Sequence, residues 1–214
     1  MEDIRTQSLA EINVLGYRGN PNLPLLDDDM KLTRTEDDIA NRINMLHLVY
    51  TTSIEGEKSV SFFYEMSKNN NWTHYLTPSE LAYLKAGKQS KEQKANYSWN
   101  KEAIFALLWA VKLVKDLRDL KQMKMGDVYS LIPPEASEEK FRKSLKLRNE
   151  KDLLKELDFF YLLHWTLKHE PQPNKLLSFF TNKIPIEIDV VMERRRALEW
   201  LFSKEDWDDV AMDT

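Results

Sequence analysis

Residues 103–111 read AIFALLWAV, and this stretch decides the fold. Nine consecutive apolar residues leave a helix no polar face, so protein must surround that helix on every side. The run is also far shorter than the roughly 20 apolar residues that span a bilayer. We therefore expect a helix over about residues 99–120 that runs through the centre of a soluble domain.

The composition favours helices in the rest of the chain as well. The 214 residues include only five glycines and eight prolines, too few for the many turns of a sandwich or barrel. Leucine occurs 29 times and valine nine times, and β-branched side chains such as valine lose rotamer freedom in helices. The expected fold class is all-α, a single-domain orthogonal bundle of about seven to nine helices around the central apolar helix.

Capping residues predict where several helices begin. Thr77-Pro78-Ser79-Glu80 combines an N-cap, a proline at the first helical position and the glutamate of a capping box. Thr35 and Asn149 are further N-caps, and Gly16 ends the first helix. A lysine-rich stretch at 87–94 leads into the central helix. The other expected helices cover residues 3–15, 58–69, 137–147, 149–168 and 190–202.

The two ends of the chain differ from its middle. Residues 1–31 are expected to form an N-terminal helix and a loop, and residues 203–214 an acidic tail that packs on the single domain. The first residues carry acids and no long apolar run, unlike a secretory signal, so a cytoplasmic location is expected. The net charge of -4 gives no electrostatic reason to expect nucleic acid or a membrane as partner.

Common catalytic motifs are absent from the sequence. It has no cysteine, no phosphate-binding glycine loop, no nucleophile elbow and no H-E-x-x-H zinc motif. We therefore expect neither a metal nor a cofactor. Four groups of residues remain as candidate sites.

The first two groups contain possible acid–base residues. Glu102 follows Trp99 at the start of the apolar helix, where it is either a general acid or base or a residue favoured by the helix dipole. Asp158 and Trp165 share a helix with His164, which interrupts an apolar face. That histidine is either a proton shuttle or a hydrogen-bonded core residue.

The other two groups lie near the end of the chain. Arg194 lies between Glu193 and Trp200 on an apolar stripe, so it is either an anion anchor or half of a buried ion pair. Trp207 is expected to pack on the core. We expect Asp208 or Asp209 to supply the carboxylate for Arg194 and close the domain.

Several segments together resemble a bacterial family known as domain of unknown function 4272. They are LTPSELAYL at 76–84, YSWNKEAIFALLWAVKLVKDL at 97–117, ELDFFYLLHW at 156–165, VVMERRRALEWL at 190–201 and DWDDVAMDT at 206–214. The sequence departs from the usual pattern of the family at Asn100, Arg195 and Glu199. The resemblance implies a helical, cytosolic bacterial protein, and it implies no reaction.

Three functions are compatible with the sequence. The first is a non-catalytic interaction or accessory protein, whose six tryptophans would anchor a protein partner. The second is a protein that binds a small anionic ligand around Trp99, Glu102, Trp165 and Arg194. The third is an acid–base enzyme that uses Glu102, Asp158 or His164. The protein is expected to be a monomer or a homodimer.

Overall fold

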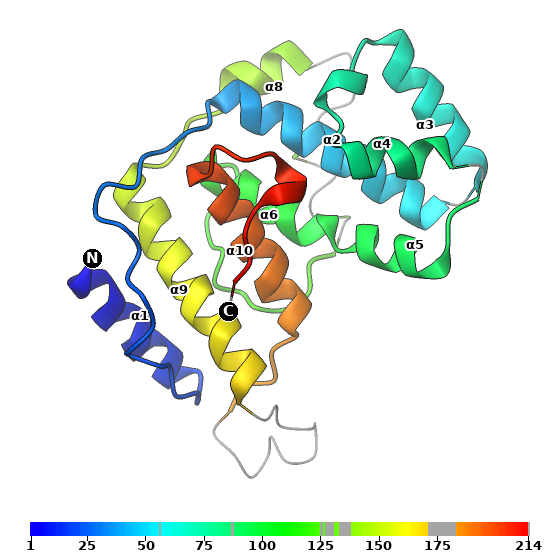
Figure 1. Cartoon of the computed structure of the whole chain (residues 1–214). Coiled ribbons are helices and arrows are strands. Elements are labelled where there is room, and N and C mark those ends of the chain that lie inside the picture. The colour runs from blue at the N-terminus through cyan, green and yellow to red at the C-terminus, as the bar shows by residue number, and fades with distance from the viewer. Residues whose placement is uncertain are drawn as a thin grey trace.

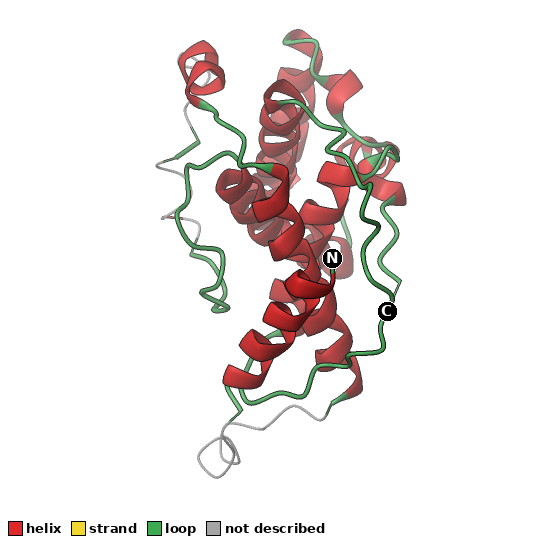
Figure 2. Cartoon of the chain, turned by 90° about the vertical axis from the view of Figure 1, so that its left-hand side faces the viewer, coloured by secondary structure: helices red, strands yellow, loops and turns green. Residues whose placement is uncertain are grey.

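The computed structural model describes residues 1–55, 57–86, 88–124, 126, 131–132, 138–170 and 183–213. Regular structure in these residues is helical and none of them forms a strand, which confirms the all-α class (Figure 2). The helices are α1 (Glu2–Val14), α2 (Glu36–Glu55), α3 (Glu57–Asn69), α4 (Pro78–Lys85), α5 (Lys91–Ser98), α6 (Asn100–Ala110), α8 (Glu138–Ser144), α9 (Glu150–His169) and α10 (Ile188–Phe202), with short 3-10 turns η1 (Thr73–Tyr75) and η4 (Trp207–Asp209).

Helix α6 occupies the centre, as its sequence predicts. Every residue of the 103–111 run is buried. Helix α6 packs against α2 and α10, α10 packs against α9, and α9 packs against α1 (Figure 1). The apolar run therefore fixes the middle of a layered helical bundle.

The central helix is nevertheless shorter than the expected 99–120. It ends at Ala110, and Lys112 takes a left-handed backbone with φ 65°. The segment that follows is not helical, so its carbonyl groups are free to accept hydrogen bonds from another helix. The preceding stretch also differs from expectation, because Ser90 and Gln93 form a capping box that starts a separate helix, α5.

The other predicted helix boundaries agree closely with the structure. Thr77 Oγ1 accepts from the Glu80 backbone N–H at 3.2 Å, and Glu80 accepts from the Thr77 N–H at 3.0 Å. Asn149 caps α9 through Asp152 N at 2.9 Å, and Gly16, with φ 85°, follows the end of α1. Helix α8 lies inside the expected 137–147, of which residue 137 falls outside the described residues.

Two apolar clusters lie on different faces of α2. The larger one joins residues of α1, α2, α6, α9 and α10, and it includes Leu46. The smaller one joins Met45 and Val49 to residues of α3 and α4. The tail packs on the larger cluster through Trp207 and Val210, which are 4% and 8% exposed. The single-domain organisation stays a prediction.

Candidate functional site

Two of the predicted site residues, Glu102 and Arg194, form a fully buried ion pair. Both side chains are 0% exposed. Glu102 Oε2 accepts from Arg194 Nε at 3.0 Å and from Nη2 at 2.7 Å, and Glu102 Oε1 accepts from the Met123 N–H at 2.7 Å. The other Arg194 N–H groups donate to the carbonyls of Leu117, Asp119 and Lys121. The pair therefore ties α6, α10 and the chain after α6 together.

The prediction that Asp208 or Asp209 pairs with Arg194 is wrong. Asp208 instead accepts from Ser79 N at 3.0 Å and from Ser79 Oγ at 2.8 Å, at the start of α4. Asp209 is exposed. The reason is geometric, because Arg194 points from α10 towards α6 while the tail returns over the start of α4.

Asp158 is also committed to an arginine. It is 0% exposed and accepts from Arg5 Nη2 at 2.8 Å. Arg5 also donates to the carbonyls of Leu23 and Pro24, so the pair holds the loop after α1 against α9. A carboxylate buried in this way supports the fold and has no access to a substrate.

His164 lies beside a cation. Its Nδ1 is 3.0 Å from Arg195 Nη1, and Arg195 Nε donates to Glu199 at 3.1 Å. Burial, with a smaller contribution from Arg195, lowers the pKa of His164 to about 4, so the ring is neutral at pH 7. Neutral Nδ1 can then accept from Arg195. Trp165 stacks on His169 at 4.1 Å between ring centroids.

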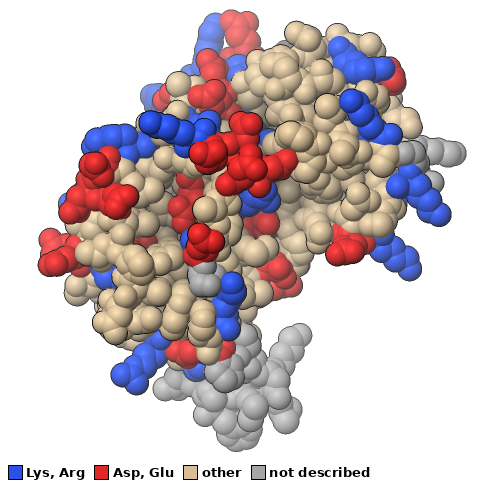
Figure 3. All heavy atoms as spheres, viewed as in Figure 1, with Lys and Arg blue, Asp and Glu red and all other residues tan. Residues whose placement is uncertain are grey.

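A cavity of about 680 Å³ brings four of the remaining candidates together, and we call it the α5–α10 pocket. Figure 3 shows a hollow in this region, with charged side chains at its edge. Trp99, Glu193, Trp207 and Asp208 line the pocket, together with Ser79, Glu80, Ala82, Tyr83, Gln93, Asn96, Tyr97, Asn100, Asp189, Met192 and Arg196. Of the four residues that the sequence grouped around a ligand, Trp99 lines this pocket, while Glu102, Trp165 and Arg194 do not.

Glu193 is the unusual residue of the α5–α10 pocket. Its side chain lines the cavity although the residue is only 7% exposed, and its Oε2 has no hydrogen-bond partner among the described residues. Burial raises the pKa of this carboxyl group, and the positive charge of Arg196 opposes the shift. An ionised group without a partner is costly in such a place, so the carboxylate has an unused capacity to bind a donor.

Trp207 forms a wall between this pocket and a smaller one. Arg196 Nη2 donates to the Trp207 carbonyl at 3.0 Å, and its guanidinium lies 5.0 Å from the indole ring. Arg42 lies 5.2 Å from the same ring, and Trp200 packs edge-on at 5.7 Å. The tail thus places one indole among two cations and a second indole.

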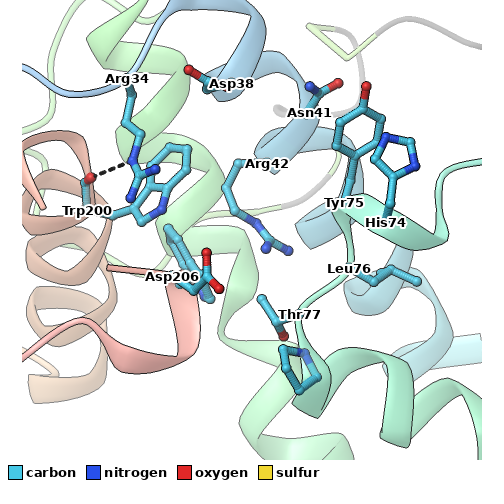
Figure 4. Close-up of a pocket in the computed structure, with 12 residues that line it drawn as sticks. Arg34, Asp38, Asn41, Arg42, His74, Tyr75, Leu76, Thr77, Trp200 and Asp206 are labelled. Atoms are coloured by element: carbon cyan, nitrogen blue, oxygen red, sulfur yellow. Dashed lines mark hydrogen bonds between the residues drawn. The ribbon is translucent and has the colours of Figure 1, made fainter. Parts of the chain in front are cut away.

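The smaller pocket holds about 220 Å³ and contains Trp200 (Figure 4). The Arg42 guanidinium points into it between Asp206 and Thr77, and it also forms a buried ion pair with Glu80. Arg34 donates to the Trp200 carbonyl at 3.2 Å. Cations and carboxylates both line this pocket, so its charges largely cancel.

Similarity to a protein family identifies the family of this chain. The family model described as Domain of unknown function (DUF4272) matches residues 5–210, nearly the whole chain. The chain belongs to the DUF4272 family. No curated protein and no solved structure matches it.

Sequence reasoning missed several residues that line the α5–α10 pocket of this DUF4272 chain. Together with Glu193, these residues follow the spacing i, i+3, i+4 and i+7, which forms one stripe along a helix: Asp189, Met192, Glu193 and Arg196. That spacing is a readable signal. Tyr83 and Tyr97 come from different helices, and their ring centroids lie 4.4 Å apart, which no local spacing predicts.

The described residues of the DUF4272 chain contain neither a metal-binding cluster nor a helix that could span a membrane. Within the described residues, no group of three or more histidine, aspartate or glutamate side chains could hold a metal ion. In the same part of the chain, every helix is too short or too polar to cross a membrane.

Proposed function

We propose that this DUF4272 protein is a non-catalytic accessory protein of the bacterial cytoplasm that binds a small molecule in the α5–α10 pocket. The observation that carries the proposal is the buried Glu193 Oε2, which has no hydrogen-bond partner among the described residues and belongs to a residue that lines a cavity of about 680 Å³. That volume lies within the roughly 300–1,000 Å³ typical of ligand pockets. Aromatic walls with a few polar groups are also typical of such sites.

The buried ion pairs support binding over acid–base catalysis. Glu102 and Asp158 are 0% exposed, and each carboxylate is held by an arginine. A general acid or base must come within hydrogen-bond reach of its substrate, and neither of these two groups lines the α5–α10 pocket or the smaller one. His164 accepts from Arg195 in the same enclosed manner.

The tryptophans give little support to anchoring of a protein partner. Anchors at interfaces are side chains that a free protein leaves accessible. All six tryptophans of this chain are at least half-buried, and three of them are only 4–6% exposed, namely Trp109, Trp200 and Trp207. Trp207 instead lines the α5–α10 pocket, and burial is expected of a residue that forms a pocket wall.

A fragment screen tests this proposal. A library of small organic compounds is added to the protein, and binding is followed by two-dimensional NMR. Ala82→Trp adds a large side chain to the lining of the pocket, while Ala95→Trp adds the same side chain to an exposed position of α5 outside the lining. We expect hits that Ala82→Trp abolishes and Ala95→Trp retains. A library without hits, or hits that are indifferent to Ala82→Trp, would contradict the proposal.

A further inference from the structure

Acidic side chains outnumber basic ones among the described residues that line the α5–α10 pocket. Four carboxylates line it, and Arg196 is the cation among the described lining residues. Glu80 pairs with Arg42, and Asp208 accepts the two donors of Ser79. Asp189 and Glu193 are left without an ion pair in the described structure, so the pocket favours a positive ligand over the anion considered from sequence.

The position of Glu193 adds a directional requirement to this charge. Its Oε2 is buried and lacks a donor among the described residues, and an ionised carboxylate accepts hydrogen bonds through both oxygens. Arg196 lies on the same helix face, but one of its guanidinium N–H groups donates to the Trp207 carbonyl. A ligand that carries both a positive charge and N–H groups would satisfy Glu193 by a charge-assisted hydrogen bond.

The walls of the pocket suit a cation with an apolar body. Trp99, Trp207, Tyr83 and Tyr97 supply aromatic rings, and Met192 adds a flexible apolar surface. Ring faces attract cations within about 6 Å, and the pocket already shows one example, since the Arg196 guanidinium lies 5.0 Å from the Trp207 ring. An ammonium group with an aromatic or aliphatic chain matches both features.

We propose that the α5–α10 pocket binds a primary or secondary amine in its protonated form, with the N–H groups on Glu193 and the apolar body against the aromatic walls. The inference rests on the proposed function and names its ligand class. Glu193 and Asp189 supply the charge, while Tyr97 and Trp99 supply surface. A quaternary ammonium has the charge but no N–H, so it meets only part of the requirement.

Four probes of similar size separate these contributions. They are phenethylamine, trimethylphenethylammonium, phenethyl alcohol and hydrocinnamate, and titration calorimetry of the whole chain measures each affinity. We expect phenethylamine to bind at least about tenfold more tightly than the alcohol, since charged hydrogen bonds are about twice as strong as neutral ones. The quaternary compound should be intermediate and the carboxylate weakest.

Matched variants locate the effect. Glu193→Gln should weaken phenethylamine at least about tenfold, and Asp189→Asn should weaken it less because Asp189 is only half-buried. Asp209→Asn removes an exposed acid outside the lining and should change nothing. Circular dichroism verifies that each variant is folded. If Glu193→Gln does not fold, Asp189→Asn still tests the charge requirement.

Failure of the inference and failure of the proposed function give different results. Equal or tighter binding of the alcohol or the carboxylate would overturn the amine inference and leave a binding pocket. The amine inference would also be overturned if library hits sensitive to Ala82→Trp exist but phenethylamine does not bind. It would likewise be overturned if Glu193→Gln binds phenethylamine as well as the native chain does. A library without any such hit would overturn both.

Discussion

Glu193 and Arg194 are neighbours on α10, yet they lie in opposite kinds of environment. Arg194 is 0% exposed, and Glu102 and three backbone carbonyls accept its hydrogen bonds. Glu193 is almost as buried, but it lines a cavity. Its Oε2 atom has no hydrogen-bond partner among the described residues. Successive residues of a helix point about 100° apart, so one turns towards α6 and the other towards the pocket. The satisfied group holds the fold together, and the unsatisfied one is available for a ligand.

The largest test of this contrast is removal of the buried guanidinium. Arg194→Ala leaves Glu102 as an uncompensated buried charge and should cost about 3–5 kcal/mol of unfolding free energy. Arg196→Ala, on the pocket face of the same helix, removes one hydrogen bond to a carbonyl and should cost about 1 kcal/mol. Urea denaturation measures both. Similar losses for the two variants would erase the distinction between the faces.

Coupling between mutations tests the identity of the partner. Glu102→Ala and Arg194→Ala remove the same ion pair, so the double variant should lose about 1–3 kcal/mol less than the sum. Arg194→Ala and Asp208→Ala share no contact and should add within about 0.5 kcal/mol. Coupling to Asp208 would instead restore the tail clasp that the sequence suggested.

The pH dependence of stability tests the unsatisfied carboxyl group. Burial raises the pKa of Glu193 above its ordinary value of 4.5, with Asp189 and Glu102 adding to the shift and Arg196 opposing it. At pH values between the ordinary pKa and the raised pKa of Glu193, the folded state holds more protons than the unfolded state. The free energy of unfolding therefore falls as the pH rises through that window.

Glu193→Gln removes this contribution. The difference in unfolding free energy between the native protein and Glu193→Gln should therefore shift in favour of the variant as the pH rises above 4.5, and urea denaturation at a series of pH values measures it. Glu156 and Glu199 also have raised pKa values, and they are common to both proteins, so the difference isolates Glu193. Glu187→Gln removes an exposed carboxyl group before α10, outside the lining of the pocket, and is the matched control.

The smallest expected effect concerns the tail at the pocket edge. Asp208→Ala removes two hydrogen bonds from the start of α4 and should cost about 0.5–1 kcal/mol in urea denaturation. Asp209→Ala alters an exposed neighbour and should stay within about 0.5 kcal/mol of the native protein. Equal losses would mean that the tail acts by its net charge and not by the Ser79 contacts.

Local signals in the sequence determined much of the fold. The apolar run 103–111 predicts the central helix because a helix with no polar face has to be enclosed. Thr77 and Glu80 predict the start of α4 because a capping box needs only residues three apart. The stripe on α10 likewise places Arg194 against the core, and the structure decides between its two alternatives in favour of the buried ion pair.

Tertiary structure decided the partners and the pocket. Arg194 meets Glu102 across 92 positions, and Arg5 meets Asp158 across 153, distances over which helix periodicity carries no information. The chain leaves the helical conformation after Ala110, and carbonyls of the segment that follows accept hydrogen bonds from Arg194. The α5–α10 pocket exists only where four helices and the tail meet, so the sequence named Glu193 and Trp99 as candidates, while packing alone set them around one cavity.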